Sequence, residues 1–340
     1  MSTRKATHAC SWYSDNEEKL THQLDQWLSL VPDTVQVGDK EFQFPVPNAR
    51  AIISPHAGYS YSGKTAAWAY KSLDLSQVHR VFILGPSHHV YLKGCALSTF
   101  TKLETPLGPL DVDVETIDKL HKTSQFIHLS PKQQEAEHSL EMQFPYLKRL
   151  FDQRGKACPV VPIIIGSIGH AEEQKFGKIF APYLASPHNA FVISSDFCHW
   201  GDRFDYTFYS DADPPSSKVG DALEGTYASV SARTIPIHKS ISALDHEGMQ
   251  IIEGLNHRSF TQYLSLTGNT ICGRHPIAVL LAALSSLEED TSEREADMPH
   301  PIIRFVQYAQ SNPVSHPQDS SVSYASAFLQ MNGTEEKVSV

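Results

Sequence analysis

Four short apolar segments constrain the fold of this chain more than any other feature of its sequence. They are rich in β-branched residues, are bounded by proline, glycine or serine, and span residues 51–54, 81–85, 160–166 and 191–195. Each is apolar throughout rather than alternating with polar residues, which is typical of strands buried on both faces of a parallel sheet. Pro162 within the third segment predicts a sheet edge or a bulge there, because proline has no amide hydrogen to donate.

Segments with helical periodicity separate these apolar runs. The alternation predicts a single layered α/β domain over residues 8–330 with a largely parallel central sheet. Two polar segments, 210–236 and 285–301, are expected to be loop insertions, and residues 331–340 a flexible tail. The helical patterns cover residues 64–73, 114–122, 138–151, 172–184, 241–254, 257–266 and 276–288, and two further strands are expected at 302–309 and 321–329.

The charge of the chain argues against a nucleic-acid-binding protein. Its 340 residues include 28 basic and 38 acidic side chains, for a formal net charge of −10, whereas a nucleic-acid footprint is basic.

No apolar run approaches the roughly 18 residues of a transmembrane helix, and the first residues lack the apolar core of a signal peptide. The five cysteines are widely spaced without a C-x-x-C pair, as in a reducing compartment. We therefore expect a cytoplasmic location, with the nucleus as an additional one.

Histidines recur at the ends of the apolar runs. His56 follows the first run, His88 and His89 follow the second, and Asp196 and His199 follow the fourth. Parallel strands share a direction, so these side chains should meet beyond one edge of the sheet, where α/β proteins bind ligands. A single histidine at a strand end is usually an ordinary loop residue, but three at one edge favour a site. Because side chains alternate along a strand, only one of His88 and His89 should face it.

A cysteine adds a possible soft ligand. Cys272 lies just before the helix expected at 276–288, with Arg274 beside it, and both features should lower the pKa of its thiol and favour the metal-binding thiolate. The alternative is a small buried apolar residue. Cys198 is a rival thiol, for which packing beneath Trp200 is an equally good interpretation.

His138 and Glu141 lie three residues apart on one expected helical face. They either support the site residues or form an ordinary surface pair. The sequence has no G-x-x-x-x-G-K-[ST], G-x-G-x-x-G, G-x-S-x-G or H-E-x-x-H motif, so it offers no support for a phosphate-cradling loop, a serine hydrolase elbow or a zinc-protease helix.

Several long motifs together resemble those of the Memo family. They are "ISPHAGYSYSG", "FILGPSHHV", "EHSLEMQFPY", "FVISSDFCHWG" and "NTICGRHPI", and "HACSWY" and "DSSVSYA" extend the resemblance to roughly residues 8–330. The family's fold is similar to that of class III extradiol dioxygenases, which are non-haem iron enzymes. The resemblance therefore implies the same layered α/β fold. The chain departs from the family pattern at Cys10, where a glycine is usual, and at 36–47 and 210–236, which look like insertions.

The resemblance also implies a metal site. By position it indicates His56, His88 and Cys272 as metal ligands, with Asp196 and His199 lining the same pocket. In the ring-cleaving relatives a carboxylate completes the site, and a thiolate in its place favours copper or a redox-active iron. Memo proteins are associated with copper or iron binding, redox activity and superoxide production, and animal members with receptor-driven motility signalling.

The leading hypothesis is thus a metalloprotein that binds reduced copper or iron. His199 would be an acid/base or oxygen-orienting group whose tautomer is held by Asp196. The reaction would be metal-dependent redox chemistry with dioxygen, or metal chaperoning that limits it. One alternative is a non-enzymatic adaptor that binds a signalling partner, as a peptide or phosphopeptide, in the same pocket. Another is extradiol ring cleavage with iron.

Overall fold

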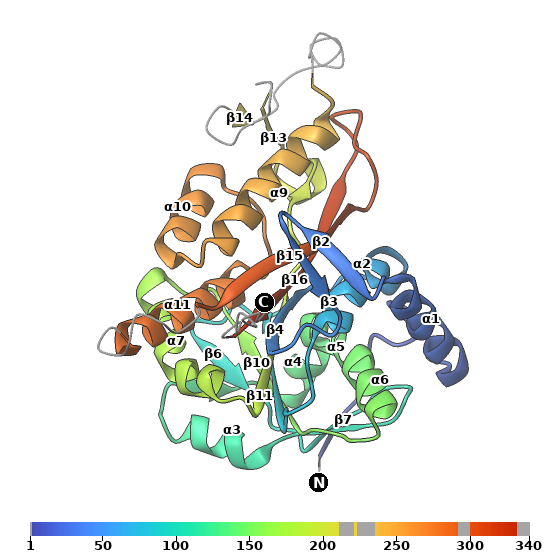
Figure 1. The fold of residues 1–340 in the computed structure, drawn as a ribbon, viewed down its shortest axis with the longest axis vertical. Helices are drawn as coiled ribbons and strands as arrows, with labels where there is room; N and C mark the ends of the chain where they lie inside the picture. Colours follow the sequence, from blue (N-terminus) through green and yellow to red (C-terminus); the bar gives the residue numbers. More distant parts are fainter. Residues whose placement is uncertain (1, 211–220, 223–234, 292–299, 332–340) are drawn as a thin grey trace, which may run out of the picture.

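A nine-stranded mixed sheet runs through the centre of the molecule (Figure 1). The computed structural model describes residues 2–210, 221–222, 235–291 and 300–331. The strands of this sheet are β4 (Ala49–Ser54), β5 (Arg80–Pro86), β6 (Cys95–Leu97), β9 (Phe126–His128), β10 (Val160–Ile165), β11 (Asn189–Ser194), β12 (His199–Trp200), β15 (Ile302–Gln310) and β16 (Ser321–Gln330). Their order is β12-β16-β4-β11-β5-β10-β6-β9, with β15 paired to the other side of β16.

The centre of the sheet is parallel. β4, β11, β5 and β10 are parallel neighbours, and they are the four apolar runs of the sequence. Every residue of β4, β10 and β11 is buried, as expected of strands covered on both faces. The predicted fold class, an α/β fold with a largely parallel central sheet, is confirmed. In the described part of the chain, the antiparallel pairs of this sheet lie towards its ends, where β16 joins β4, β12 and β15, and where β6 joins β10.

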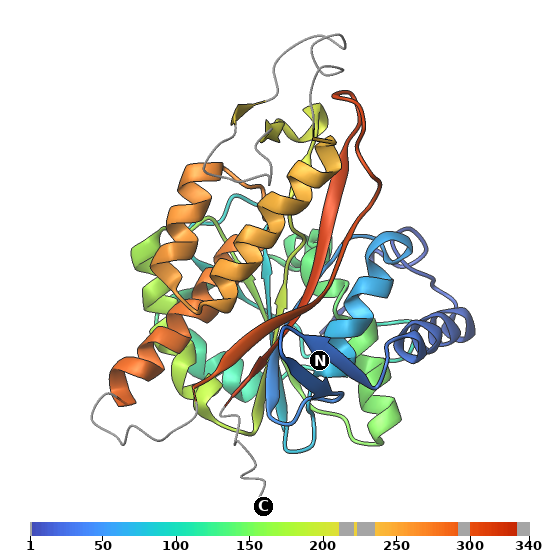
Figure 2. The same cartoon turned by 45° about the horizontal axis from the view of Figure 1, so that its top comes forward.

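Helices cover both faces of the sheet. α7 and α11 pack against β5 and β11 on one face, while α2 and α5 lie on the other, with α1 and α6 outside α2 (Figure 1). The β15–β16 hairpin runs along the molecule beside α9 (Figure 2). The helices are α1 (Glu17–Leu30), α2 (Tyr59–Ser72), α3 (Val114–His121), α4 (Pro131–Ala136), α5 (His138–Glu141), α6 (Phe144–Arg154), α7 (His170–Ala185), α9 (Ile237–Glu253), α10 (His257–Thr267) and α11 (Arg274–Thr291).

Several short strands lie outside the central sheet. β1 (Thr3–Arg4), β7 (Lys102–Leu103) and β8 (Leu110–Asp111) form a small sheet of their own. β2 (Thr34–Val37) and β3 (Lys40–Gln43) form a hairpin within the segment that looked like an insertion, and Phe42 anchors it against Phe328, with ring centroids 5.0 Å apart.

Pro162 lies in an interior strand, not in an edge strand. β10 is paired with β5 on one side and with β6 on the other. The β6 pairing begins only at Ile163, however, so at Pro162 the strand is paired with β5 alone. Proline has no amide hydrogen, and at this position no neighbouring strand needs to accept a hydrogen bond from one.

The segment expected to be a loop from residue 285 begins as helix. α11 continues to Thr291, and Leu287 packs against the hydrophobic core, so the apolar face of the helix extends into the start of the segment that was expected to be a loop. Residues 292–299 lie outside the described residues, as do 332–340 of the expected tail. Of the expected 210–236 insertion, the structure describes β14 (Asp221–Ala222), which pairs with β13 (Phe208–Tyr209) just before the insertion.

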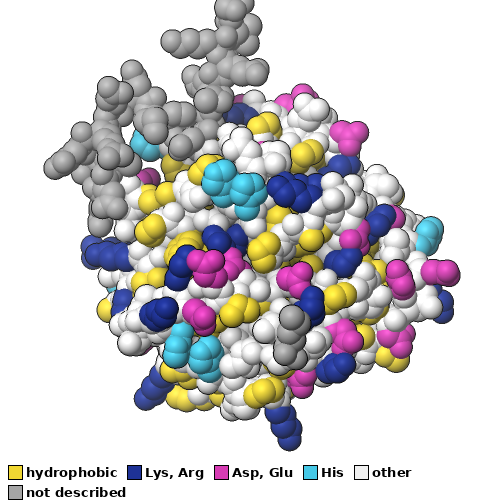
Figure 3. All heavy atoms as spheres, turned by 90° about the horizontal axis from the view of Figure 1, so that it is seen from below, with side chains coloured by type: hydrophobic (Ala, Val, Ile, Leu, Met, Phe, Trp, Pro, Cys, Tyr) yellow, Lys and Arg dark blue, Asp and Glu magenta, His cyan; other side chains and the backbone are white. Residues whose placement is uncertain are grey.

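The surface gives no sign of a basic footprint on the face shown in Figure 3. Acidic and basic side chains are interspersed there, without an extended area of one charge among the described residues in view. Within the same described ranges, no helix combines the length and apolarity needed to cross a bilayer.

Cys10, which stands where a glycine is usual in the resembling family, adopts a left-handed backbone conformation with φ of 72°. Its amide donates to the Tyr13 carbonyl oxygen at 2.8 Å, which holds this tight turn closed.

Replacing Cys10 by glycine should stabilise the fold. A β-carbon in the left-handed conformation destabilises the folded state by about 1–2 kcal/mol, but glycine also gives the unfolded chain more conformational freedom, which offsets part of that gain. We expect Cys10→Gly to raise the free energy of unfolding by roughly 0.5–1 kcal/mol in urea denaturation. Cys10→Ser, which keeps the β-carbon, should give no gain; equal stability of the two variants would contradict the prediction.

Candidate functional site

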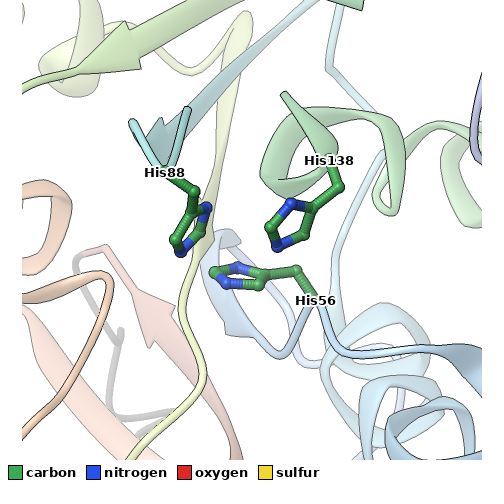
Figure 4. Close-up of side chains that lie close together, drawn as sticks. All are labelled: His56, His88 and His138. Carbon is green, nitrogen blue, oxygen red and sulfur yellow. The ribbon is translucent and has the colours of Figure 1, made fainter. Parts of the chain in front are cut away.

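Three imidazoles converge beyond the carboxyl edge of the sheet (Figure 4). His56 follows β4, His88 follows β5, and His138 is the first residue of α5. One ring nitrogen from each lies within 4.8 Å of the others, and the ring centroids of His56 and His88 are 5.2 Å apart. They line an open pocket of about 590 Å³, which Asp196 and His199 also line. The predicted meeting of strand-end histidines therefore occurs.

The tautomer of His56 is fixed by a chain of hydrogen bonds. The Ser194 hydroxyl donates its one hydrogen to the carbonyl oxygen of Ser139 at 2.7 Å, and its oxygen accepts from the Gln143 side-chain amide. His56 Nδ1, 2.8 Å from the same hydroxyl oxygen, must therefore donate to it. The Nε2 of His56 is left with a lone pair, and burial and the neighbouring His88 lower the pKa of this imidazole so that it stays neutral.

His88 is oriented by Glu137. The Glu137 carboxylate accepts from the His88 backbone amide at 2.6 Å and from His88 Nδ1 at 2.9 Å. Burial disfavours the ionised carboxyl, but the hydrogen bond from His88 and the nearby imidazoles outweigh it and lower the pKa of Glu137 to about 2. The carboxylate is therefore an acceptor, and the His88 Nε2 carries the free lone pair. His88 rather than His89 belongs to the group of three imidazoles, although both residues are exposed and the ring of His89 lies 5.9 Å from that of His138.

His138 belongs to the cluster, a role the sequence left open. Its ring stacks on that of His88 with centroids 4.4 Å apart. Burial, with the added effect of His88, lowers the pKa of His138 to about 3. Among the residues that the structure describes, its Nδ1 is one of three buried side-chain polar atoms without a hydrogen-bond partner. This Nδ1 lies 3.7 Å from the Oε1 of Glu137, beyond hydrogen-bond distance, and one nitrogen of the same ring is grouped with those of His56 and His88.

Cys272 contacts His56 but is not part of the group that His56 forms with His88 and His138. Its Sγ is 3.1 Å from the Nε2 of His56 and accepts from the Asp196 backbone amide at 3.2 Å. The loop fits closely because residue 273 is glycine: a β-carbon there would lie 2.3 Å from that of Ser195. The predicted lowering of the thiol pKa is wrong. Burial, followed by the charge of Asp196, raises the pKa of Cys272, and these effects outweigh Arg274.

Asp196 and His199 enter the pocket with different partners from those expected. The Oδ1 of Asp196 accepts from the backbone amide of His56 at 2.8 Å, and burial raises the pKa of this carboxyl to about 7. The Nδ1 of His199 lies 2.9 Å from the carbonyl oxygen of Phe197 and 3.2 Å from that of Thr270. Because carbonyls only accept, they hold the proton on Nδ1. The tautomer of His199 is thus set by the backbone rather than by Asp196.

Glu141 and Cys198 lie outside the imidazole cluster. Glu141 is fully buried, and its carboxylate accepts from Arg4 at 2.6 Å and from Tyr13 at 2.8 Å, so it is not half of a surface pair. Cys198 is fully buried in the hydrophobic core together with Trp200. This leaves Cys272 as the thiol beside the histidines.

The residues that orient the cluster were not predicted from the sequence. Glu137, Ser194 and Gln143 fix the Nδ1 hydrogens of His56 and His88, as outer partners of metal-binding histidines commonly do. Glu137 directly precedes His138 within a motif that the sequence singles out, so a carboxylate next to a candidate histidine is the signal that could have found it.

The donor set fits a transition metal. Neutral imidazole nitrogens and a thiol are ligands for copper, iron and zinc, whereas magnesium and calcium prefer oxygen. The Nε2 lone pair of His56 faces the Cys272 thiol at 3.1 Å, the Nε2 of His88 is left as the acceptor nitrogen of its ring, and the Nδ1 of His138 lacks a hydrogen-bond partner within the described residues. The nitrogen atoms of the pocket can therefore donate lone pairs to a metal ion.

Comparisons with known proteins agree with the motifs that build this pocket. A family model described as "Memo-like protein" matches residues 4–328. Protein MEMO1 of Xenopus laevis is 44% identical over 326 residues, covering 96% of this chain and 97% of the relative, and Protein MEMO1 of Homo sapiens is 43% identical with the same coverage. The crystal structure of an uncharacterized protein from Escherichia coli K12 aligns with a TM-score of 0.39 and 13% identity, over 82% of this chain and 99% of that one. Because the family match runs from β1 into β16 and takes in every segment that lines the pocket, the chain belongs to the Memo family.

Proposed function

We propose that this protein binds copper or iron in the pocket and uses it in redox chemistry with dioxygen. The observation that carries the proposal is the fixed tautomer of two imidazoles. Hydrogen-bond acceptors hold the Nδ1 protons of His56 and His88, which leaves both Nε2 lone pairs at the cluster. Such pre-orientation is typical of metal-ligating histidines and has no role in an ordinary hydrophobic core.

Cys272 is the third ligand of the proposed site. Its Sγ lies 3.1 Å from the Nε2 of His56, and the two atoms must move apart to about 3.6 Å to share one tetrahedral metal ion. Metal coordination deprotonates a thiol outright, which would overcome the burial that keeps this thiol protonated without an ion. His138 is the competing third ligand, since its ring nitrogen is grouped with those of His56 and His88.

A bound copper or iron ion would supply electron transfer to or from dioxygen. The protein residues would then bind and orient small molecules and manage protons. His199, protonated at Nδ1 by its backbone contacts, offers Nε2 to the pocket as a base or as a hydrogen-bond acceptor for an acidic hydrogen. Asp196 positions the backbone of His56 and is the pocket carboxyl with a pKa of about 7. We propose His199 and Asp196 as the catalytic residues.

Anaerobic loading with copper(I) or iron(II), followed by elemental analysis and X-ray absorption spectroscopy, tests this function. We expect one tightly held ion per chain, nitrogen ligands at about 2.0–2.1 Å and one sulfur at about 2.3 Å. Oxygen consumption and superoxide formation should require the loaded ion. Absence of tight binding for both metals would overturn the proposal, and a nitrogen-only spectrum would replace Cys272 by His138.

Glu137→Gln should weaken metal binding without removing a ligand. A neutral amide no longer holds the Nδ1 proton of His88 by charge, and loss of such an outer partner typically costs about 10–100-fold in metal affinity. Competition titration with a chelator measures the change. Glu135→Gln is the matched control: Glu135 lies in the neighbouring helix α4, is half-buried, and accepts from the Lys5 backbone amide at 3.0 Å, so this variant should bind metal like the wild type. Equal affinity of Glu137→Gln and the wild type would show that His88 needs no such support.

A further inference from the structure

A second group of metal-binding side chains lies where three helices begin. His170 and Glu173 are in the first turn of α7, His257 is the first residue of α10, and His275 is the second residue of α11. One nitrogen or oxygen from each of His170, Glu173 and His257 lies within 4.8 Å of the others. This is one of two such groups in the described part of the chain, the other being the imidazole cluster of the pocket.

The contacts around Glu173 resemble those of a metal-binding carboxylate. Its Oε2 lies 2.8 Å from the Nε2 of His257, and its Oε1 lies 2.7 Å from the Nδ1 of His275. The ring of His170 stacks on that of His257, with centroids 4.4 Å apart and planes 8° from parallel. Glu173 and His257 are buried, whereas His170 is exposed. Removing a carboxylate from water costs free energy, and packing alone does not explain why one is buried between two imidazoles.

We propose that His170, Glu173 and His257 form a second metal site, which binds a zinc ion with one position open to solvent. Two nitrogens and one carboxylate oxygen are the ligands of many zinc sites that keep an open fourth position, whereas magnesium and calcium prefer oxygen alone. His275 holds the other oxygen of Glu173 and is the outer partner that orients the carboxylate.

The distances allow zinc with small side-chain movements. Two atoms that each lie about 2.0–2.1 Å from a tetrahedral zinc ion are about 3.4 Å apart. The contact between His257 and Glu173 must therefore open by roughly half an ångström, and exposed His170 can rotate to complete the set. The positive ends of three helix dipoles oppose a cation here, and the negative charge of Glu173 offsets them.

The open position faces a cleft of about 1170 Å³. His170 and His257 line it, together with Lys178, Arg258 and His300. This cleft is distinct from the pocket of the imidazole cluster, and the two have no lining residue in common. The basic side chains suit an anionic or neutral group as the exchangeable ligand of the ion, with water as the simplest case.

Zinc titration of the full chain by calorimetry, with anomalous diffraction at the zinc edge, tests the site. We expect the wild type to bind one zinc equivalent more than His170→Gln, with an anomalous peak between His170, Glu173 and His257. Exposed His170 can be changed without disturbing the core, and Glu173→Gln is a second variant that keeps the buried shape. His246→Gln, an exposed histidine of α9, is the control and should retain the full stoichiometry. Magnesium in excess should not displace the ion.

The same titration in a His88→Gln background separates this proposal from the function proposed above. The zinc equivalent that is lost in His170→Gln should still bind to His88→Gln, even if the imidazole cluster binds no metal. Equal zinc stoichiometry in the wild type and His170→Gln, together with no anomalous peak at Glu173, would overturn the second site.

Discussion

Cys272→Ser is expected to fold like the wild type but to lose copper or iron binding and oxygen chemistry together. Serine has nearly the same shape as cysteine but lacks the soft sulfur that binds copper(I) strongly. Removal of an outer partner of a metal ligand typically costs about 10–100-fold in affinity, and loss of the ligand itself should cost more. Chelator competition for the metal and an oxygen electrode for the reaction measure the two losses.

Two variants make the result of Cys272→Ser decisive. Cys10→Ser removes an exposed thiol and should leave both measurements unchanged. His138→Gln removes the competing ligand, and a larger loss there than in Cys272→Ser would make His138 the third ligand. A non-enzymatic adaptor would keep its affinity for a peptide partner in Cys272→Ser, because the pocket shape survives. Unchanged metal affinity and oxygen consumption in a folded Cys272→Ser protein would contradict the proposed thiolate ligand.

Glu141→Gln is expected to lower the free energy of unfolding by about 3–5 kcal/mol, the usual cost of leaving a buried charge without its partner. Arg4 and Glu141 are both buried, with 2.6 Å between the guanidinium and the carboxylate, and His8 adds a contact of 2.8 Å. The amide accepts some of these hydrogen bonds but cannot neutralise Arg4. Urea denaturation at pH 7 measures the difference. Glu115→Gln is the control, because its ion pair with Lys119 is exposed and should change stability by less than about 1 kcal/mol.

The effect of Glu141→Gln should depend on pH in one direction. Burial disfavours the carboxylate, but the hydrogen bond from His8 and the charge of Arg4 outweigh it, and the pKa of Glu141 falls to about 2 from its ordinary 4.5. A depressed pKa stabilises the folded state above pH 4.5, and this stabilisation is lost as the pH falls towards 2. The gap between the wild type and Glu141→Gln should therefore stay constant from pH 8 to 5 and shrink below 4.5. A gap that grows on acidification would contradict the assignment.

Residue patterns were enough to predict the parallel core of the central sheet and the edge at which the site lies. Unbroken apolarity in four short runs leaves burial on both faces as the physical solution, and parallel pairing brings their carboxyl ends together. His56 and His88 could be placed at one edge for that reason. The prediction depends only on parallel strand direction, which follows from the helical connections between the runs.

Which histidine faces the pocket and how the thiol titrates depend on contacts between distant parts of the folded chain. His88 rather than His89 faces the pocket because Glu137, 49 residues away, accepts from both its backbone and its ring. The pKa of Cys272 is raised because the folded chain buries the thiol beside Asp196, and these effects outweigh the neighbouring Arg274 that the sequence shows.

The second group of ligands was invisible in the sequence for the same reason. Glu173 and His257 are 84 residues apart, and His275 lies on a third helix, so no spacing rule connects them. Their meeting follows from the packing of α7, α10 and α11, in which the starts of three helices reach one point. Local patterns determine which segments become strands and helices, but burial, tautomers and ligand sets depend on contacts between segments that are distant in the chain.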